Sequence, residues 1–148
     1  MTTDKKAVPI LIADDNQADC VLMRAAFSDA KVPNPLQFVR DGQELIESLH
    51  RQRLNGPPEA MPGLILMDLN MPRLDGKQTL RVLRGDPLLR HIPVLIVSTS
   101  AFHEEVLHCY EIGANSFLVK PFDYDEFVKA LGTMADYWMN KVELPGPR

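Results

Sequence analysis

Residues 64–68, Leu-Ile-Leu-Met-Asp, constrain the fold of this chain more than any other segment. Four apolar residues run directly into Asp68. An apolar run without alternation predicts a strand buried on both faces, as in a parallel sheet. Packing does not require a carboxylate at the end of such a strand, and desolvation of the carboxylate costs free energy. Asp68 therefore indicates chemistry at the carboxyl end of the strand, where open α/β sheets bind their ligands.

Short apolar runs alternate with longer amphipathic runs along the chain, a pattern typical of an α/β fold. The expected strands are 8–13, 36–39, 64–67, 94–97 and 116–119. The expected helices are 17–30, 43–53, 76–85, 103–112 and 124–140. Because crossovers between parallel strands are right-handed, the helices must cover both faces of the sheet. We therefore expect a single doubly wound domain, with Asn16 and Asp123 as helix caps and the strand that holds Gln37 at an edge.

The composition is that of an ordinary globular domain. The chain has 148 residues, enough for one domain with a substantial core. Its net charge of -4 and the lack of a Lys/Arg cluster argue against DNA binding. No apolar stretch reaches the about 18 to 20 residues of a membrane span, and the N-terminus lacks a signal-peptide pattern. We expect a cytoplasmic protein in which Cys20 and Cys109 are reduced packing residues.

Other expected strands also end in residues that carry chemistry. Asp14 and Asp15 follow the first strand, Ser98 follows the fourth and Lys120 follows the fifth. Because the carboxyl ends of parallel strands meet at one edge of a sheet, these side chains should converge with Asp68. Three carboxylates and one ammonium suit one divalent metal ion and one phosphoryl group.

Asp68 is the expected nucleophile, because a carboxylate can accept a phosphoryl group as an acyl phosphate. The other two aspartates would repel phosphate unless a hard cation such as Mg²⁺ lay between them. We expect Asp15 and Asp68 to bind Mg²⁺ directly, Asp14 to act through water or to support the direct ligands, and the backbone carbonyl of Asn70 to complete the set.

Two further residues are expected to contact the phosphoryl group itself. Lys120 would pair with it as a point charge, and Ser98 would donate a hydrogen bond from its hydroxyl. We also expect a cis peptide bond between Lys120 and Pro121, since proline tolerates this geometry in tight turns.

At these residues the chain resembles the receiver domain of two-component response regulators. The motifs that carry the resemblance are Ile12-Ala-Asp14-Asp15-Asn16, Met67-Asp68-Leu-Asn-Met-Pro72 with Asp75-Gly76, Pro93-Val-Leu-Ile-Val-Ser98, Gly113-Ala114 and Lys120-Pro-Phe122. The resemblance covers about residues 8–138. It implies a flavodoxin-like topology, with a five-stranded parallel sheet in the order 2-1-3-4-5 and five helices. The domain would then span 8–140, after a disordered or short arm at 1–7 and before a tail at 141–148.

The resemblance also implies a function in phosphorelay signal transduction. A sensor histidine kinase would phosphorylate Asp68 with Mg²⁺ bound at the acidic pocket. Ser98 would be the switch hydroxyl and Phe117 the switch aromatic, acting by steric coupling because it lacks the hydroxyl of a tyrosine. Asn70 and Ser100 fall at the positions that tune dephosphorylation. Such a domain is not an enzyme beyond slow self-phosphorylation and dephosphorylation, and it switches the face of its fourth helix, fifth strand and fifth helix.

A narrower resemblance is to stand-alone receivers that partner bacterial phytochrome histidine kinases. It is carried by the long first helix, the Pro33-Asn34-Pro35 connection, Asp41-Gly42, the extended loop 53–63 and the tail from Tyr137 to Pro145. It implies that a bacteriophytochrome is the kinase and that the domain itself is the output, without DNA binding.

The last expected helix carries two apolar stripes at helical spacing. One stripe consists of Phe127, Leu131, Met134 and Trp138, and the other of Val128, Ala135, Met139 and Val142. Two stripes exceed what one sheet face needs to cover, so a partner is expected to cover part of this area. We expect a homodimer through the fourth helix, fifth strand and fifth helix.

Two other functions remain open on the residues alone. One is a metal-dependent phosphohydrolase that turns over a small substrate, although Asn70 cannot serve as the acid that aspartyl-phosphate hydrolases of the dehalogenase class use at that position. The other is a flavodoxin-like cofactor module, although residues 14–17, Asp-Asp-Asn-Gln, repel phosphate unless a metal is present.

Overall fold

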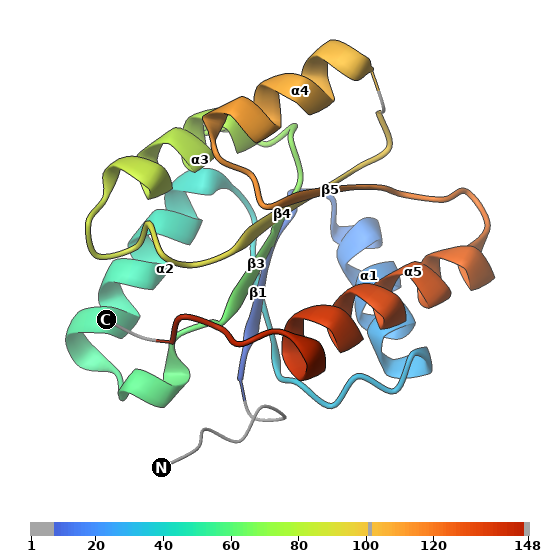
Figure 1. Ribbon diagram of the computed structural model, residues 1–148, viewed down its shortest axis with the longest axis horizontal. Helices are drawn as coiled ribbons and strands as arrows, with labels where there is room; N and C mark the ends of the chain where they lie inside the picture. Colours follow the sequence, from blue (N-terminus) through green and yellow to red (C-terminus); the bar gives the residue numbers. More distant parts are fainter. Residues whose placement is uncertain (1–7, 101, 147–148) are drawn as a thin grey trace.

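The computed structural model describes residues 8–100 and 102–146, and these form an α/β domain built on one parallel sheet (Figure 1). The sheet has five strands in the order β2-β1-β3-β4-β5. The strands are β1 (Ile10–Ala13), β2 (Leu36–Val39), β3 (Leu64–Met67), β4 (Val94–Ser98) and β5 (Ser116–Val119). This order confirms the predicted fold class, and it places β2 at an edge as expected from Gln37.

Five α-helices cover the two faces of the sheet. Figure 1 shows α2, α3 and α4 on one side and α1 and α5 on the other. The helices are α1 (Gln17–Asp29), α2 (Gly42–Asn55), α3 (Gly76–Gly85), α4 (His103–Ile112) and α5 (Tyr124–Asp136). A 3-10 turn, Pro58–Ala60, precedes β3, and a π-helical segment, Tyr137–Lys141, extends α5.

Four helices begin at a side chain that caps them. The side chains of Asn16, Asp41, Asp75 and Asp123 each accept a hydrogen bond from a backbone N–H in the first turn of the helix that follows. Such caps satisfy donors that the helix itself leaves unpaired. The predicted caps at Asn16 and Asp123 are confirmed.

The core is divided into two clusters by the sheet. One lies under α2, α3 and α4 and includes Leu45, Leu80 and Cys109. The other lies under α1 and α5 and includes Phe27 and Leu131. The three central strands are buried along their whole length, which is why they read as unbroken apolar runs.

The face that α1 buries differs from the apolar spacing seen in the sequence. Val21, Leu22, Ala25 and Ala26 are apolar at helical spacing, but Val21 is 65% exposed and Leu22 is 46% exposed. The helix instead buries Met23, Ala26 and Phe27. Apolar residues lie on more than one side of this helix, so packing against the sheet decides which side is covered.

Most residues of both apolar stripes of the C-terminal helix pack within the chain itself, which leaves less apolar area for a partner than the sequence suggested. Ala135 and Met139 are as buried as Leu131 and belong to the same cluster. The chain continues past α5 to Leu144, which packs partly buried on this cluster and lies close to Gly63 before β3. Ala135 and Met139 of the second stripe are therefore covered within the chain, whereas Val128 and Val142 are only partly buried.

Two further expectations concern the backbone and the membrane. No cis peptide bond occurs among residues 8–100 and 102–146, so the prediction for Lys120–Pro121 is wrong. None of the helices in the described part of the chain combines the length and apolar character that a membrane crossing needs. The predicted N-terminal arm, 1–7, lies outside the described residues.

Candidate functional site

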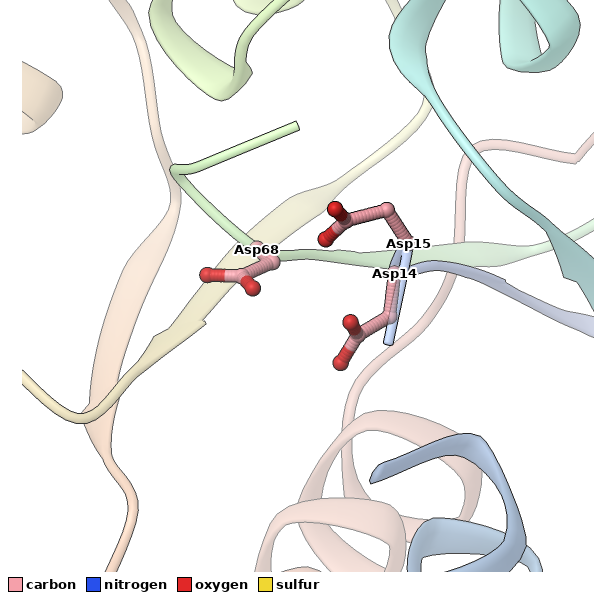
Figure 2. A group of neighbouring side chains, drawn as sticks. All are labelled: Asp14, Asp15 and Asp68. Atoms are coloured by element: carbon pink, nitrogen blue, oxygen red, sulfur yellow. The ribbon is translucent and has the colours of Figure 1, made fainter. Parts of the chain in front are cut away.

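Three carboxylates meet at the carboxyl ends of β1 and β3. Asp14 and Asp15 follow β1, Asp68 follows β3, and the two strands are paired in register up to Ala13 and Met67. One carboxylate oxygen from each aspartate lies within 4.8 Å of those of the other two. Figure 2 shows the three side chains grouped beyond the strand ends. The structure thus brings together the acidic residues that the sequence indicated.

These carboxylates lie in different environments. Asp14 is buried, Asp68 is partly buried and Asp15 is exposed. Burial raises the pKa of Asp68, and the negative charge of Asp14 raises it further, against the opposing effects of Lys120 and backbone N–H groups. Burial likewise raises the pKa of Asp14, against hydrogen bonds and the charge of Lys120. The charges of Asp14 and Asp68 are therefore unfavourable together, and a cation bound beside them would relieve this repulsion.

The donor atoms of this group fit a hard divalent cation. Mg²⁺ and Mn²⁺ prefer oxygen ligands, and Mg²⁺ commonly takes one or two carboxylates and retains several waters. Asp14 and Asp68 supply oxygens fixed by burial, and Asp15 supplies an oxygen that faces solvent. An open groove of about 460 Å³ adjoins Asp14 and Asp15 on the β2 side, between Cys20 and Glu44. Ions and water can therefore reach these two carboxylates.

Lys120 supplies the positive charge beside the carboxylates. It follows β5, and its backbone N–H donates to the carbonyl of Ser98 at 2.8 Å. Its Nζ lies 3.5 Å from Oδ2 of Asp14 and 3.7 Å from Oδ2 of Asp19. Asp19, in the first turn of α1, was missed by the sequence reasoning. Its only signal was its place one helical turn after Asp15.

Ser98 and Phe117 lie on the same face of the sheet. Ser98 is 2% exposed, and its Oγ accepts a hydrogen bond from the backbone N–H of Ser100 at 3.1 Å. Phe117 pairs in register with Ile96, two residues before Ser98, and it packs partly buried on the core cluster under α2, α3 and α4.

The loop between β3 and α3 places backbone donors on Asp68. The N–H of Leu69 donates to Oδ1 of Asp68 at 2.7 Å, and the N–H of Asn70 also hydrogen-bonds this carboxylate. The side chain of Asn70 is exposed. The base of the loop is closed by a hydrogen bond of 2.8 Å from the N–H of Gly76 to the carbonyl of Leu69.

The two cysteines are free, as expected. Cys109 is buried in the core, and Cys20 donates from its Sγ to the backbone carbonyl of Asp14 at 3.5 Å. Burial raises the pKa of both thiols, which disfavours the reactive thiolate.

Comparison with known proteins places these features in one family. The sequence model of the response regulator receiver domain matches residues 10–132. Response regulator Rcp1 of Synechocystis sp. is 31% identical over 137 residues, which are 92% of this chain and 92% of that protein. A solved structure of Rcp1 in its Mn²⁺-bound form has a TM-score of 0.81 at 30% identity, over 94% of this chain and 99% of the other.

Two further solved structures are similar over nearly their whole length. Response regulator RPA3017, in red light signaling of R. palustris, has a TM-score of 0.85 and 34% identity, and the match covers 93% of this chain and 98% of the other. The phosphorylated cyanobacterial phytochrome response regulator RcpA has a TM-score of 0.84 and 30% identity, with coverage of 95% and 99%.

Proposed function

This chain belongs to the response regulator receiver domain family, and on that premise we propose that it accepts a phosphoryl group on Asp68 from a sensor histidine kinase. The observation that carries this proposal is the grouping of three carboxylates from β1 and β3 within 4.8 Å of one another. The ammonium of Lys120, 3.5 Å from Asp14, adds the positive charge that a phosphoryl group requires. Its placement is typical of an electrostatic site for phosphoryl transfer.

The reaction is a transfer of phosphorus from nitrogen to oxygen. A carboxylate oxygen of Asp68 attacks the phosphorus of the kinase phosphohistidine, and the bond from phosphorus to the imidazole nitrogen breaks. The imidazole keeps the electron pair and takes up a proton, and Asp68 becomes an acyl phosphate. Asp68 is partly exposed, so an incoming donor can reach it. The positive charge of Lys120 stabilises the negative charge on the phosphoryl oxygens during the transfer.

A divalent ion, Mg²⁺ in the cell, would be held by Asp14, Asp15 and Asp68, with the backbone carbonyl of Asn70 completing the set. It would neutralise charge between the carboxylates and the phosphoryl oxygens. The hard-oxygen donor set supports this, as does the Mn²⁺-bound structure of Rcp1. Asn70 and Ser100 would tune the rate at which the acyl phosphate is hydrolysed.

Phosphorylation would switch the face formed by α4, β5 and α5. The phosphoryl group would draw in Ser98 and Lys120, and Phe117 would follow Ser98 on the shared face of the sheet. One charge-assisted hydrogen bond contributes about 1.5 to 3 kcal/mol. A shift from 1:99 to 99:1 requires about 5.5 kcal/mol. One such bond is not enough alone, so contacts of the switched face with a partner should contribute to the free energy of the switch.

A second copy of the chain is the partner that we assign to this face. Leu107 and Tyr110 on α4 and Val119 on β5 are each more than 40% exposed although apolar or aromatic. These side chains, rather than the second stripe of α5, support a homodimer. A monomeric mass in light scattering, with and without beryllofluoride, would refute it.

The kinase is proposed to be of the bacteriophytochrome type and to act on this protein in the cytoplasm. The similarity to RcpA and RPA3017, whose names refer to phytochrome and to red light signaling respectively, supports this assignment. The protein would act as a phosphoryl acceptor and not as a turnover enzyme, and it would not bind DNA.

Phosphorylation can be tested directly. Incubation with acetyl phosphate and Mg²⁺ should add one phosphoryl group to the intact mass, stable in acid and labile in base. Asp68→Asn should abolish the added mass, whereas Asp125→Asn, at an exposed aspartate in the first turn of α5, should retain it. Labelling of Asp68→Asn at the original level would contradict the assignment. Release of phosphate from small metabolites over many turnovers would favour a phosphohydrolase instead.

A further inference from the structure

The loop between β3 and α3 is fastened to the N-terminus of α2 at two points. The backbone N–H of Gly42 donates to the carbonyl of Leu74 at 3.2 Å. Beside it, the guanidinium of Arg73 makes two hydrogen bonds to the carboxylate of Asp41, from Nε to Oδ2 at 3.0 Å and from Nη2 to Oδ1 at 3.1 Å. A bidentate pair of this kind fixes orientation as well as distance. The loop cannot shift relative to α2 without breaking it.

Arg73 adopts a backbone conformation that its residue type disfavours. Its φ is 63°, in the left-handed region that glycine, asparagine and aspartate adopt far more readily. A glycine at this position would make the same turn without strain. The arginine therefore contributes something that the turn itself does not require, and its contact with Asp41 identifies that contribution.

Asp41 is a fixed partner for Arg73. It is 7% exposed, and its Oδ1 also accepts a hydrogen bond from the backbone N–H of Glu44 at 2.8 Å, which caps α2. Burial alone would raise the pKa of Asp41, but the hydrogen bonds from Arg73 and Glu44 outweigh it and lower the pKa. The carboxylate is therefore ionised at neutral pH and held in place by the helix that it caps.

The same loop supplies the backbone groups that contact the phospho-acceptor. Leu69 and Asn70, whose N–H groups hydrogen-bond the carboxylate of Asp68, lie four and three residues before Arg73 in the loop that Arg73 anchors. A loop freed from α2 would let these donors, and the carbonyl of Asn70, move away from Asp68. The anchor therefore acts on the site without touching it.

We propose that Arg73 is a positioning residue of the phosphoryl site: by pairing with Asp41 it holds the β3–α3 loop in the form that binds a divalent cation beside Asp68. This inference rests on the proposed function. Loss of groups that orient metal ligands commonly lowers metal affinity by about 10- to 100-fold. Because Arg73 acts through a loop with other anchors, its loss should weaken the affinity by at least about fivefold.

The test measures binding of Mn²⁺ alone, from the electron paramagnetic resonance signal of the free ion. Arg73→Asn removes the guanidinium but tolerates the left-handed backbone, and Arg73→Gly also removes the strain. Both should weaken Mn²⁺ binding by at least about fivefold, and Arg73→Lys should give an intermediate loss because it cannot form the bidentate pair. Arg51→Asn, at an exposed arginine on α2, is the matched control and should bind as the original protein does.

Asp41→Asn provides a second route to the same contact. Asparagine caps helices as well as aspartate does, so α2 should remain intact while the ion pair is lost. Asp41→Asn should lower the Mn²⁺ affinity as much as Arg73→Asn does. The double variant should bind Mn²⁺ no more weakly than either single variant. In each variant the amide resonances of Leu69 and Asn70 should shift, which a loss of stability elsewhere in the fold would not cause.

The outcomes separate this inference from the proposed function. If the original protein binds Mn²⁺ and is phosphorylated on Asp68 but Arg73→Asn and Arg73→Gly bind Mn²⁺ equally well, the role of Arg73 is refuted and the proposed function stands. If Arg73→Asn binds Mn²⁺ weakly but Arg73→Gly binds it as the original protein does, the conformation of the turn matters rather than the ion pair. The inference also fails in that case. If the original protein neither binds Mn²⁺ nor accepts a phosphoryl group, both proposals fail.

Discussion

Arg84 of α3 donates a hydrogen bond of 2.9 Å from its Nε to the backbone carbonyl of Gly113, at the turn between α4 and β5. Its other nitrogens donate to the carbonyls of Arg90 and Ile92 and to the side chain of Asn115, at distances between 2.8 and 3.1 Å. One side chain thus joins the end of α3, the start of β4 and the start of β5, at the end of the sheet opposite to the acidic site.

Arg84→Lys is expected to destabilise the fold, because a single ammonium cannot reach acceptors that lie on several sides of a planar guanidinium. Backbone carbonyls left without a donor cost about 1 to 3 kcal/mol of unfolding free energy in total. Denaturation by urea should show this loss. Arg81→Lys is the control, since Arg81 pairs only with the exposed His108 in the contacts described, and it should change stability by less than about 0.5 kcal/mol. Equal effects of the two substitutions would contradict the special role of Arg84.

Lys120 neutralises a buried carboxylate before any phosphoryl group arrives. Lys120→Met should therefore lower the unfolding free energy by about 2 kcal/mol at neutral pH without metal, because Asp14 is left buried without a cation. The loss should shrink on acidification, since a protonated Asp14 needs no partner, and in saturating Mg²⁺. Lys129→Met is the matched control, because Lys129 pairs with Glu126 at the surface and such pairs contribute about 0 to 1 kcal/mol. If Lys120→Met lowers the unfolding free energy by the same amount at every pH, this explanation is refuted.

The strands and most helix boundaries could be predicted because their signals are local. An unbroken apolar run predicts a buried strand, and Asn16 or Asp123 can cap only the residues that follow it. The grouping of Asp14 with Asp68 could also be predicted, because the strand ends of a parallel sheet meet at one edge. The sheet order was available only through the resemblance to a family.

Long-range contacts could not be predicted, because nothing in the spacing of the residues encodes them. Arg73 and Asp41 are separated by more than thirty residues, and each has ordinary explanations as a turn and a cap. The buried face of α1 also cannot be predicted from spacing alone, since Val21 and Phe27 are both apolar and packing against the sheet decides which is covered. The π-helical continuation of α5 buries Met139, which the apolar spacing in the sequence did not indicate.

Asp68→Asn should stabilise the metal-free protein at neutral pH. The pKa of Asp68 is raised in the folded state by burial and by Asp14, so the folded state holds its proton to higher pH than the unfolded state does. Stability therefore falls as the pH rises from the unfolded pKa to the folded pKa, and the full penalty applies above it. An asparagine carries no charge and can still accept from Leu69. The melting temperature should rise by roughly 2 to 4 °C at pH 7, the change that 1 kcal/mol produces in a domain of this size.

The rise in melting temperature caused by Asp68→Asn should disappear near pH 3, where Asp68 is largely protonated in both the folded and the unfolded state. Glu111→Gln, at an exposed carboxylate on α4, is the control and should leave the melting temperature nearly unchanged at both values of pH. If Asp68→Asn raises the melting temperature equally at pH 3 and pH 7, packing rather than ionisation explains the stabilisation. A loss of stability at pH 7 would contradict the electrostatic account of the site.

Asp15→Asn should separate metal binding from folding. Asp15 is exposed, so its charge costs little in the metal-free protein and its substitution should leave that melting temperature almost unchanged. Mg²⁺ at 100 times its dissociation constant should stabilise the original protein by about 2.7 kcal/mol, or roughly 5 to 10 °C. Asp15→Asn should lose most of this increase, and Asp125→Asn should keep it. An equal increase in all three proteins, measured by calorimetry, would place the cation away from the strand ends, and no increase in the original protein would mean that the three carboxylates do not hold Mg²⁺.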